Sequence, residues 1–85
     1  SSATKMIEFI IGIIGMICIL TAFILDEFVK NFNQETIQYN VLNIVGALLL
    51  TYYAISLNSW PFIILNLVWF LSAGLKLVHI LRKKN

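Results

Sequence analysis

Three stretches of about 20 predominantly apolar residues constrain this chain more than any other feature, at positions 6–25, 37–57 and 61–81. A helix of about 20 apolar residues is what crosses the roughly 30 Å hydrocarbon core of a bilayer. A soluble domain could bury one such helix, but the residues left over here are too few to cover three. We therefore expect an all-α integral membrane protein, a three-helix bundle forming a single transmembrane domain over residues 1–85.

The composition agrees with a membrane protein. Of the 85 residues, 60% are hydrophobic and 12% are charged, whereas soluble domains carry roughly 45–50% and about 25%. The formal net charge of +2 is too small to indicate a nucleic-acid partner, and the single Cys18 excludes a disulfide within the chain. The apolar run after Lys5 is longer than the core of a signal peptide and no cleavage site follows it, so we expect it to remain as a span.

The connections between the spans differ in length. Residues 26–35 hold four charges and predict a loop of about ten residues, which can begin with a frayed helical end. Residues 58–61 predict a much tighter turn. There Asn58 or Ser59 would cap the third helix, Pro61 would lie in its first turn, and Trp60 would lie at the membrane interface.

The distribution of basic residues predicts the orientation. The first loop and the C-terminal tail share one side of the membrane and carry Lys30, Arg82, Lys83 and Lys84, whereas the opposite side offers Lys5. Cytoplasmic loops are enriched in Lys and Arg. We therefore expect a multi-pass protein of the cell (plasma) membrane with its N-terminus outside and its C-terminus in the cytoplasm.

Small and polar side chains recur at helical spacing within all three spans. Because the bilayer core offers no water, they should face other helices or a wet cavity. The second span has the clearest stripe, at intervals of 3, 4, 4, 3 and 4 residues: Asn40, Asn43, Ala47, Thr51, Ala54 and Asn58. The first span carries Gly12, Gly15 and Ala22, and the third carries Asn66, Trp69, Ala73 and Lys76.

These stripes admit two interpretations. Small residues let helix backbones approach closely, which favours helix packing at Gly12, Gly15, Gly46, Ala47 and Ala73. At a rise of about 1.5 Å per residue, Asn43 and Asn66 lie within roughly 8 Å of the midplane. Their amides therefore either hold neighbouring helices together or bind something that crosses the membrane.

The sequence lacks the residue patterns of an enzyme, a cofactor site or a metal site. Cys18 is flanked by Ile17 and Ile19 without an evident base, and no glycine-rich phosphate loop is present. His79 has no second His, Cys or carboxylate at metal-ligand spacing. Lys76 is expected to extend its ammonium group to the cytoplasmic interface. We expect no catalytic activity, no cofactor and no metal.

The chain combines three spans and a tight second turn with the segment from Pro61 to Asn66, and with Gly46, Tyr53 and Ala54 in the second span. In these features it resembles the SemiSWEETs, small bacterial transporters of the SWEET and PQ-loop class. The resemblance implies a three-helix protomer that forms a parallel homodimer around a site at the midplane.

A related group of small bacterial and archaeal membrane proteins, whose function is unsettled, is more similar still. The matching residues are Tyr39-Asn40, Leu42-Asn43, Gly46, Leu65-Asn66 and Trp69. Two SemiSWEET features are missing. Leu25 and Asp26 stand near the place of a Pro-Gln pair that lets the first helix bend, and Leu50 replaces a Trp that stacks on sugar.

The resemblance suggests a substrate site, because a polar solute is commonly held between an aromatic ring and amides. The residues expected to bind it are Asn66, Trp69, Asn43, Thr51 and Tyr53. The leading hypothesis is a transporter of a small polar solute such as a sugar, working as a homodimer. The alternatives are a structural accessory subunit of a larger membrane complex and a pore-forming protein of the holin type.

Overall fold

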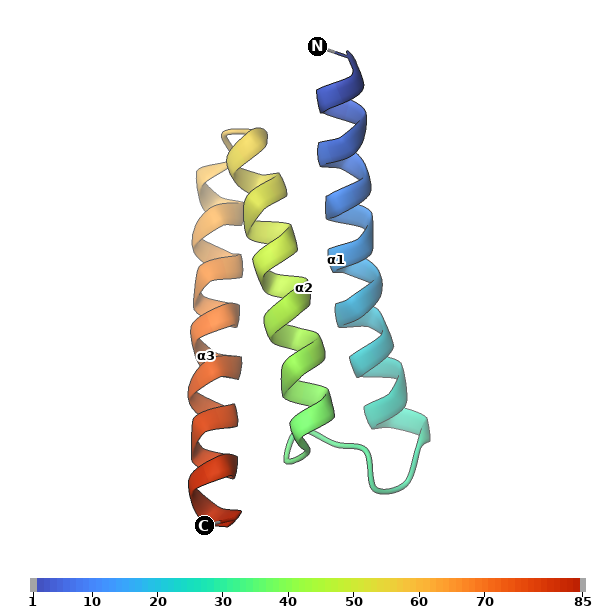
Figure 1. Ribbon diagram of the computed structural model, residues 1–85, viewed down its shortest axis with the longest axis vertical. Helices are drawn as coiled ribbons and strands as arrows, with labels where there is room; N and C mark the ends of the chain where they lie inside the picture. Colours follow the sequence, from blue (N-terminus) through green and yellow to red (C-terminus); the bar gives the residue numbers. More distant parts are fainter. Residues whose placement is uncertain (1, 85) are drawn as a thin grey trace.

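The computed structural model describes residues 2–84, which form three helices: α1 (Ser2–Phe28), α2 (Ile37–Ser56) and α3 (Trp60–Lys84). The chain runs along the long axis of the molecule three times (Figure 1). Each helix is long and apolar enough to cross a membrane. The expected three-helix bundle is therefore confirmed, with apolar faces that fit a lipid environment. The side chain of Lys84, counted above for the orientation, lies outside the described residues.

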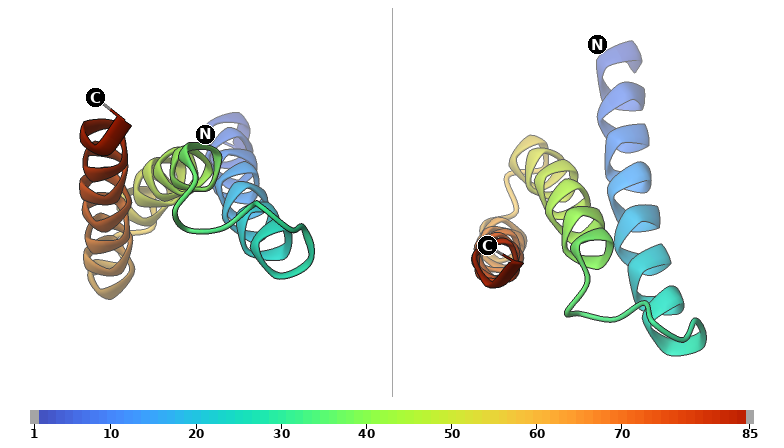
Figure 2. Two further views of the ribbon diagram at one scale, coloured as in Figure 1. Left: turned by 90° about the horizontal axis from the view of Figure 1, so that it is seen from below. Right: turned by 60° about the horizontal axis from the view of Figure 1, so that its bottom comes forward.

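Helix α2 lies between α1 and α3. It packs against both, whereas the described residues show no contact between α1 and α3. Figure 2 shows the same order from two further sides. In its most apolar stretch α2 buries 33% of its residues, against 17% for each outer helix. The central position explains why α2 carries the most complete stripe of small and polar residues.

The contact between α1 and α2 depends on glycines. A Cβ atom added at Gly15 would lie 2.8 Å from the Gly46 carbonyl oxygen, and one added at Gly46 would lie 2.8 Å from the Gly15 carbonyl oxygen. One turn away, a Cβ at Gly12 would lie 2.6 Å from the Tyr53 ring. The two backbones therefore touch directly, and the contact extends to Ala22, which is fully buried.

Four polar residues in the helices are buried, and each donates a side-chain hydrogen bond to a main-chain carbonyl. This arrangement satisfies polar groups where the bilayer supplies no water. The amide of Asn40 donates to Gln34 and Thr36 (both 2.9 Å). The other three donate four residues back along their own helices: Asn43 to Tyr39 (2.9 Å), Thr51 to Ala47 (2.7 Å) and Asn66 to Phe62 (2.8 Å).

The connection between α1 and α2 begins later than the charge pattern predicts, because α1 continues to Phe28 and includes Asp26 and Glu27 in its last turn. Thr36 then caps α2. Its backbone is extended (φ −95°, ψ 152°) and its hydroxyl accepts a hydrogen bond from the Tyr39 amide (3.2 Å). This bond satisfies one of the unpaired amides of the first turn.

The turn between α2 and α3 assigns different roles to the two expected capping residues. Asn58 follows the end of α2 in a left-handed conformation (φ 55°), and the amides of Asn58 and Ser59 donate to the carbonyls of Ile55 and Ala54, respectively. This is the Schellman pattern. Ser59 then accepts the first bond of α3, from the Ile63 amide (2.9 Å). Asn58 is exposed because α2 ends before it.

Candidate functional site

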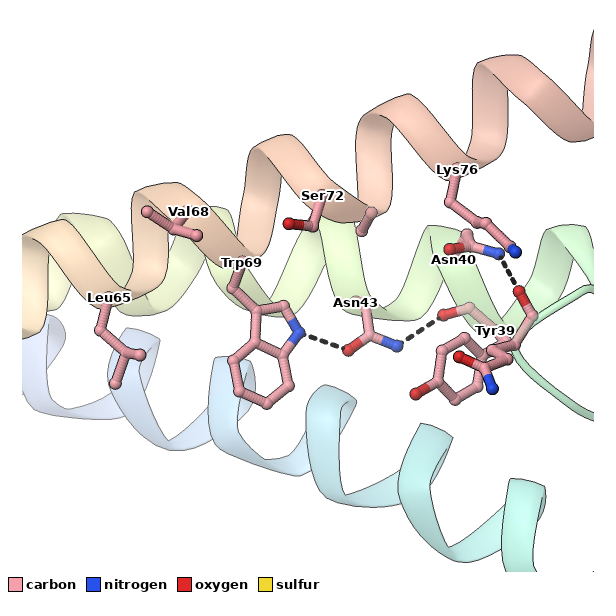
Figure 3. Close-up of a pocket in the computed structure, with 10 residues that line it drawn as sticks. Tyr39, Asn40, Asn43, Leu65, Val68, Trp69, Ser72 and Lys76 are labelled. Atoms are coloured by element: carbon pink, nitrogen blue, oxygen red, sulfur yellow. Dashed lines mark hydrogen bonds between the residues drawn. The ribbon is translucent and has the colours of Figure 1, made fainter.

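A polar groove of about 430 Å³ lies between α2 and α3. Helix α2 contributes polar residues and α3 contributes one face, while the connecting segment closes one end (Figure 3). The lining residues are Gln34, Tyr39, Asn40, Asn43, Leu65, Val68, Trp69, Ser72, Ala73 and Lys76. The α3 members recur every three or four residues, so a single helical face supplies them all. No α1 residue lines the groove, which is partly open to its surroundings in a single chain.

The centre of the groove is a hydrogen-bonded pair. The indole Nε1–H of Trp69 donates to Oδ1 of Asn43 (2.7 Å), and the Asn43 amide donates in turn to the Tyr39 carbonyl (Figure 3). Counted along the helix axis at about 1.5 Å per residue, Asn43 and Trp69 each lie about 5 Å from the middle of their own helix. A direct bond between two polar side chains at this depth both joins α2 to α3 and fixes the position of the indole ring.

The other end of the groove carries an ion pair. The ammonium group of Lys76 lies 2.5 Å from the carboxylate of Glu35, which belongs to the connecting segment. The hydrogen bond from Lys76 lowers the pKa of Glu35 below its ordinary value of 4.5, and the charges of Lys76, Lys83 and His79 add to this effect while desolvation opposes it. Lys76 thus extends towards the connecting segment and meets a carboxylate there; its place at a cytoplasmic interface stays a prediction.

The two ends of the groove differ in chemistry. Near Trp69 the lining is apolar and aromatic, with Leu65 and Val68. Towards Lys76 it offers amides, hydroxyls and one positive charge. The lining thus contains groups that can hydrogen-bond a small polar molecule and a ring face that can pack on it. The described residues include no cluster of three metal-ligating side chains.

The structure brings together two of the five residues expected to bind substrate. Asn43 and Trp69 share the groove, whereas Asn66, Thr51 and Tyr53 do not line it. Asn66 is 3% exposed and Thr51 is buried. Tyr53 lies on the α1 side, where it lines a separate apolar cavity of about 280 Å³. Within one chain these five residues do not form one site, and a substrate role for the last three stays a prediction.

Sequence reasoning overlooked the polar end of the groove. Lys76 was expected at the interface, Asn40 was placed on the inward stripe of the second span without a role of its own, and Ser72 was not predicted to line a site. A signal for Lys76 was available, because it follows Trp69 by seven residues and therefore lies two turns further along the same face of the helix. The part played by Glu35 had no comparable signal, since it depends on how the connecting segment crosses to α3.

The sequence model of one protein family matches residues 9–84. The chain belongs to that family. The family carries no described function, so membership alone supplies no activity. No curated protein and no solved structure matches the chain significantly. Nothing in these comparisons links the chain to the SemiSWEETs, and that resemblance remains an expectation from the sequence.

Proposed function

We propose that this protein transports a small polar solute across the cell membrane as a parallel homodimer, with the solute bound in the polar groove between α2 and α3. The observation that carries the proposal is the Asn43–Trp69 pair, which lines the groove near the middle of two membrane-length helices. Polar groups at that depth are costly unless they serve packing or a pathway. The groove volume of about 430 Å³ falls within the range of small-molecule sites, roughly 300–1,000 Å³.

A second copy would complete the site. The groove has walls on α2 and α3 but none from α1, so one chain cannot enclose a solute. A second copy related by a twofold axis along the membrane normal would present the same groove and close the open side. In the orientation expected from the basic residues, the N-terminus is outside and the C-terminus cytoplasmic, which places the Lys76 end of the groove nearer the cytoplasm.

Uptake into proteoliposomes tests the proposal, with labelled glucose, sorbitol and gluconate as probes. Asn43→Leu removes an amide from the groove, and Asn66→Leu is the matched control. Both residues are buried asparagines that donate to a carbonyl four residues back, but Asn66 does not line the groove. We expect uptake by the wild type, at least a tenfold loss in Asn43→Leu, and near-normal uptake in Asn66→Leu.

Other outcomes have defined meanings. Loss of uptake in both variants, with normal size-exclusion profiles, would favour the wider site predicted from the sequence, in which Asn66 also binds solute. No uptake of any probe by the wild type, or equal uptake by wild type and Asn43→Leu, would contradict transport through the groove.

Gly74 favours a second candidate function, that of a structural accessory subunit in a larger membrane complex. A Cβ atom added at Gly74 would meet nothing within 4 Å, so packing within the chain does not require a glycine there. Small residues on an outer face allow another helix to approach closely. Native mass measurement after mild detergent extraction separates the two functions. A transporter should run at about 19 kDa, twice the chain mass of 9.7 kDa, whereas an accessory subunit should co-purify with larger partners.

A further inference from the structure

Lys76 is the charged residue among those that line the groove, and its counter-ion comes from outside the lining. Glu35 reaches Lys76 from the connecting segment, with 58% of its side chain exposed against 36% for Lys76. The segment holds its own shape through the Glu35 amide, which donates to Oδ1 of Asn33 (2.8 Å). The Glu35 carboxylate therefore lies at the end of the groove, on a side chain that is more than half exposed.

We propose that the solute carried by the groove bears a carboxylate, which binds Lys76 in place of Glu35. This inference rests on the proposed function and specifies its substrate class. An ammonium group offers three donors to an anion, and the exposed Ser72, one turn before Lys76 in the lining, can hydrogen-bond the rest of the molecule. At about 1.5 Å per residue, Lys76 lies about 10 Å along α3 from Trp69, a distance comparable to the length of an extended sugar acid such as gluconate.

The charge of the lining selects among the classes of solute. The lining holds one lysine and no acidic residue, so a cation gains no counter-charge there and is repelled by the ammonium group. A neutral sugar leaves the ion pair of Lys76 with Glu35 intact and gains no charge interaction. An anion exchanges with Glu35 and gains a charge-assisted hydrogen bond.

A lipid phosphate shares part of this chemistry, because the Lys76 ammonium group meets Glu35 at the level of the connecting segment. Lys83 is exposed near the end of α3 and could also bind a headgroup. Lys76 differs from Lys83 in that it lines the groove, together with the hydroxyl of Ser72 on the same helix. The groove therefore favours a free hydroxy acid, whose hydroxyl groups the lining can hydrogen-bond.

Equilibrium binding to the protein in phosphatidylcholine nanodiscs tests the inference, with gluconate and sorbitol as a matched pair that differ in one carboxylate. We expect gluconate to bind at least tenfold more tightly than sorbitol. Lys76→Gln should abolish this preference, and Glu35→Gln should strengthen gluconate binding about threefold or more by removing the competing anion. Lys83→Gln, which changes a lysine outside the groove, should leave the preference unchanged. A folding defect would weaken gluconate binding, so it cannot explain the tighter binding that we expect for Glu35→Gln.

The contrary results separate this inference from the proposed function. Equal binding of the two probes, or a gluconate preference that survives Lys76→Gln, overturns the carboxylate assignment and leaves transport of neutral solutes standing. A preference that disappears in phosphatidylglycerol nanodiscs shows that a lipid headgroup occupies Lys76 and also overturns it. Absence of both binding and uptake for both probes overturns the proposed function together with the inference.

Discussion

Adding one methyl group at Gly15 should separate α1 from α2. The new Cβ would lie 2.8 Å from the Gly46 carbonyl oxygen and 2.9 Å from the Leu49 Cβ, whereas ordinary contact begins at 3.4 Å. Neither atom is the end of a flexible side chain, so the two helices must move apart by about 0.6 Å. A gap of this size forfeits about a quarter to a half of each dispersion contact, and overpacking of this kind costs about 1–3 kcal/mol.

The alanine recovers part of that loss, because glycine within a helix is less favourable than alanine by about 0.5–1 kcal/mol. The net destabilisation expected for Gly15→Ala is therefore about 0–2.5 kcal/mol, with a middle value of about 1 kcal/mol. Gly74→Ala is the matched control, since a Cβ there meets nothing within 4 Å. It should leave the protein as stable as the wild type or slightly more stable.

Unfolding in mixed micelles of mild detergent and dodecyl sulfate, followed by circular dichroism, measures both variants on one scale. The midpoint should fall for Gly15→Ala and stay or rise for Gly74→Ala. A Gly15→Ala protein at least as stable as Gly74→Ala would refute the reasoning, because it would mean that α1 and α2 are not in backbone contact at Gly46.

Three further predictions follow from the polar contacts. Trp69→Phe removes the indole donor to Asn43 and should lower the free energy of unfolding by about 0.6–2 kcal/mol in the same titration; an unchanged midpoint would contradict a stabilising bond. Thr36→Ala removes the cap of α2 and should cost about 1 kcal/mol, while Thr36→Ser should restore most of it. Acidification below 4.5, the ordinary pKa of Glu35, should release its ion pair with Lys76. Because the folded-state pKa is lowered, the stabilisation is complete above 4.5 and is lost as the pH falls through the folded-state value. Spin labels on the connecting segment and α3 should report a longer distance in acid, and a constant distance would argue against release.

The inward faces of the helices could be predicted from the sequence, because a polar group in a bilayer must find a partner inside the protein. Asn40, Asn43 and Thr51 follow helical spacing and are all buried. The same argument explains the single exposed member of that stripe. Asn58 has the right spacing, but α2 ends at Ser56. Helical spacing does not predict which way a residue faces once the chain has left the helix.

The partner of each inward face could not be predicted in the same way. Spacing shows which residues share a face, but it does not show which helix covers that face. Asn43 meets Trp69 on α3, whereas Gly46, three residues later, meets Gly15 on α1. The five residues expected to bind substrate were chosen by type and spacing, without knowledge of which side of α2 each neighbouring helix covers. The structure separates Tyr53, on the α1 side, from Trp69, on the α3 side.

The two contacts of α2 differ because the neighbouring helices bring different side chains. At α1 the glycines allow the backbones to touch, and the cavity beside Gly12 and Tyr53 is almost wholly apolar. At α3 the contact is a hydrogen bond between the side chains of Trp69 and Asn43, and a groove with polar lining residues lies beside it. Close backbone contact and a solute site cannot occupy the same face of one helix. Substitutions on the α1 side, such as Gly15→Ala, should therefore alter stability first, whereas substitutions at the Lys76 end of the groove should alter ligand binding first.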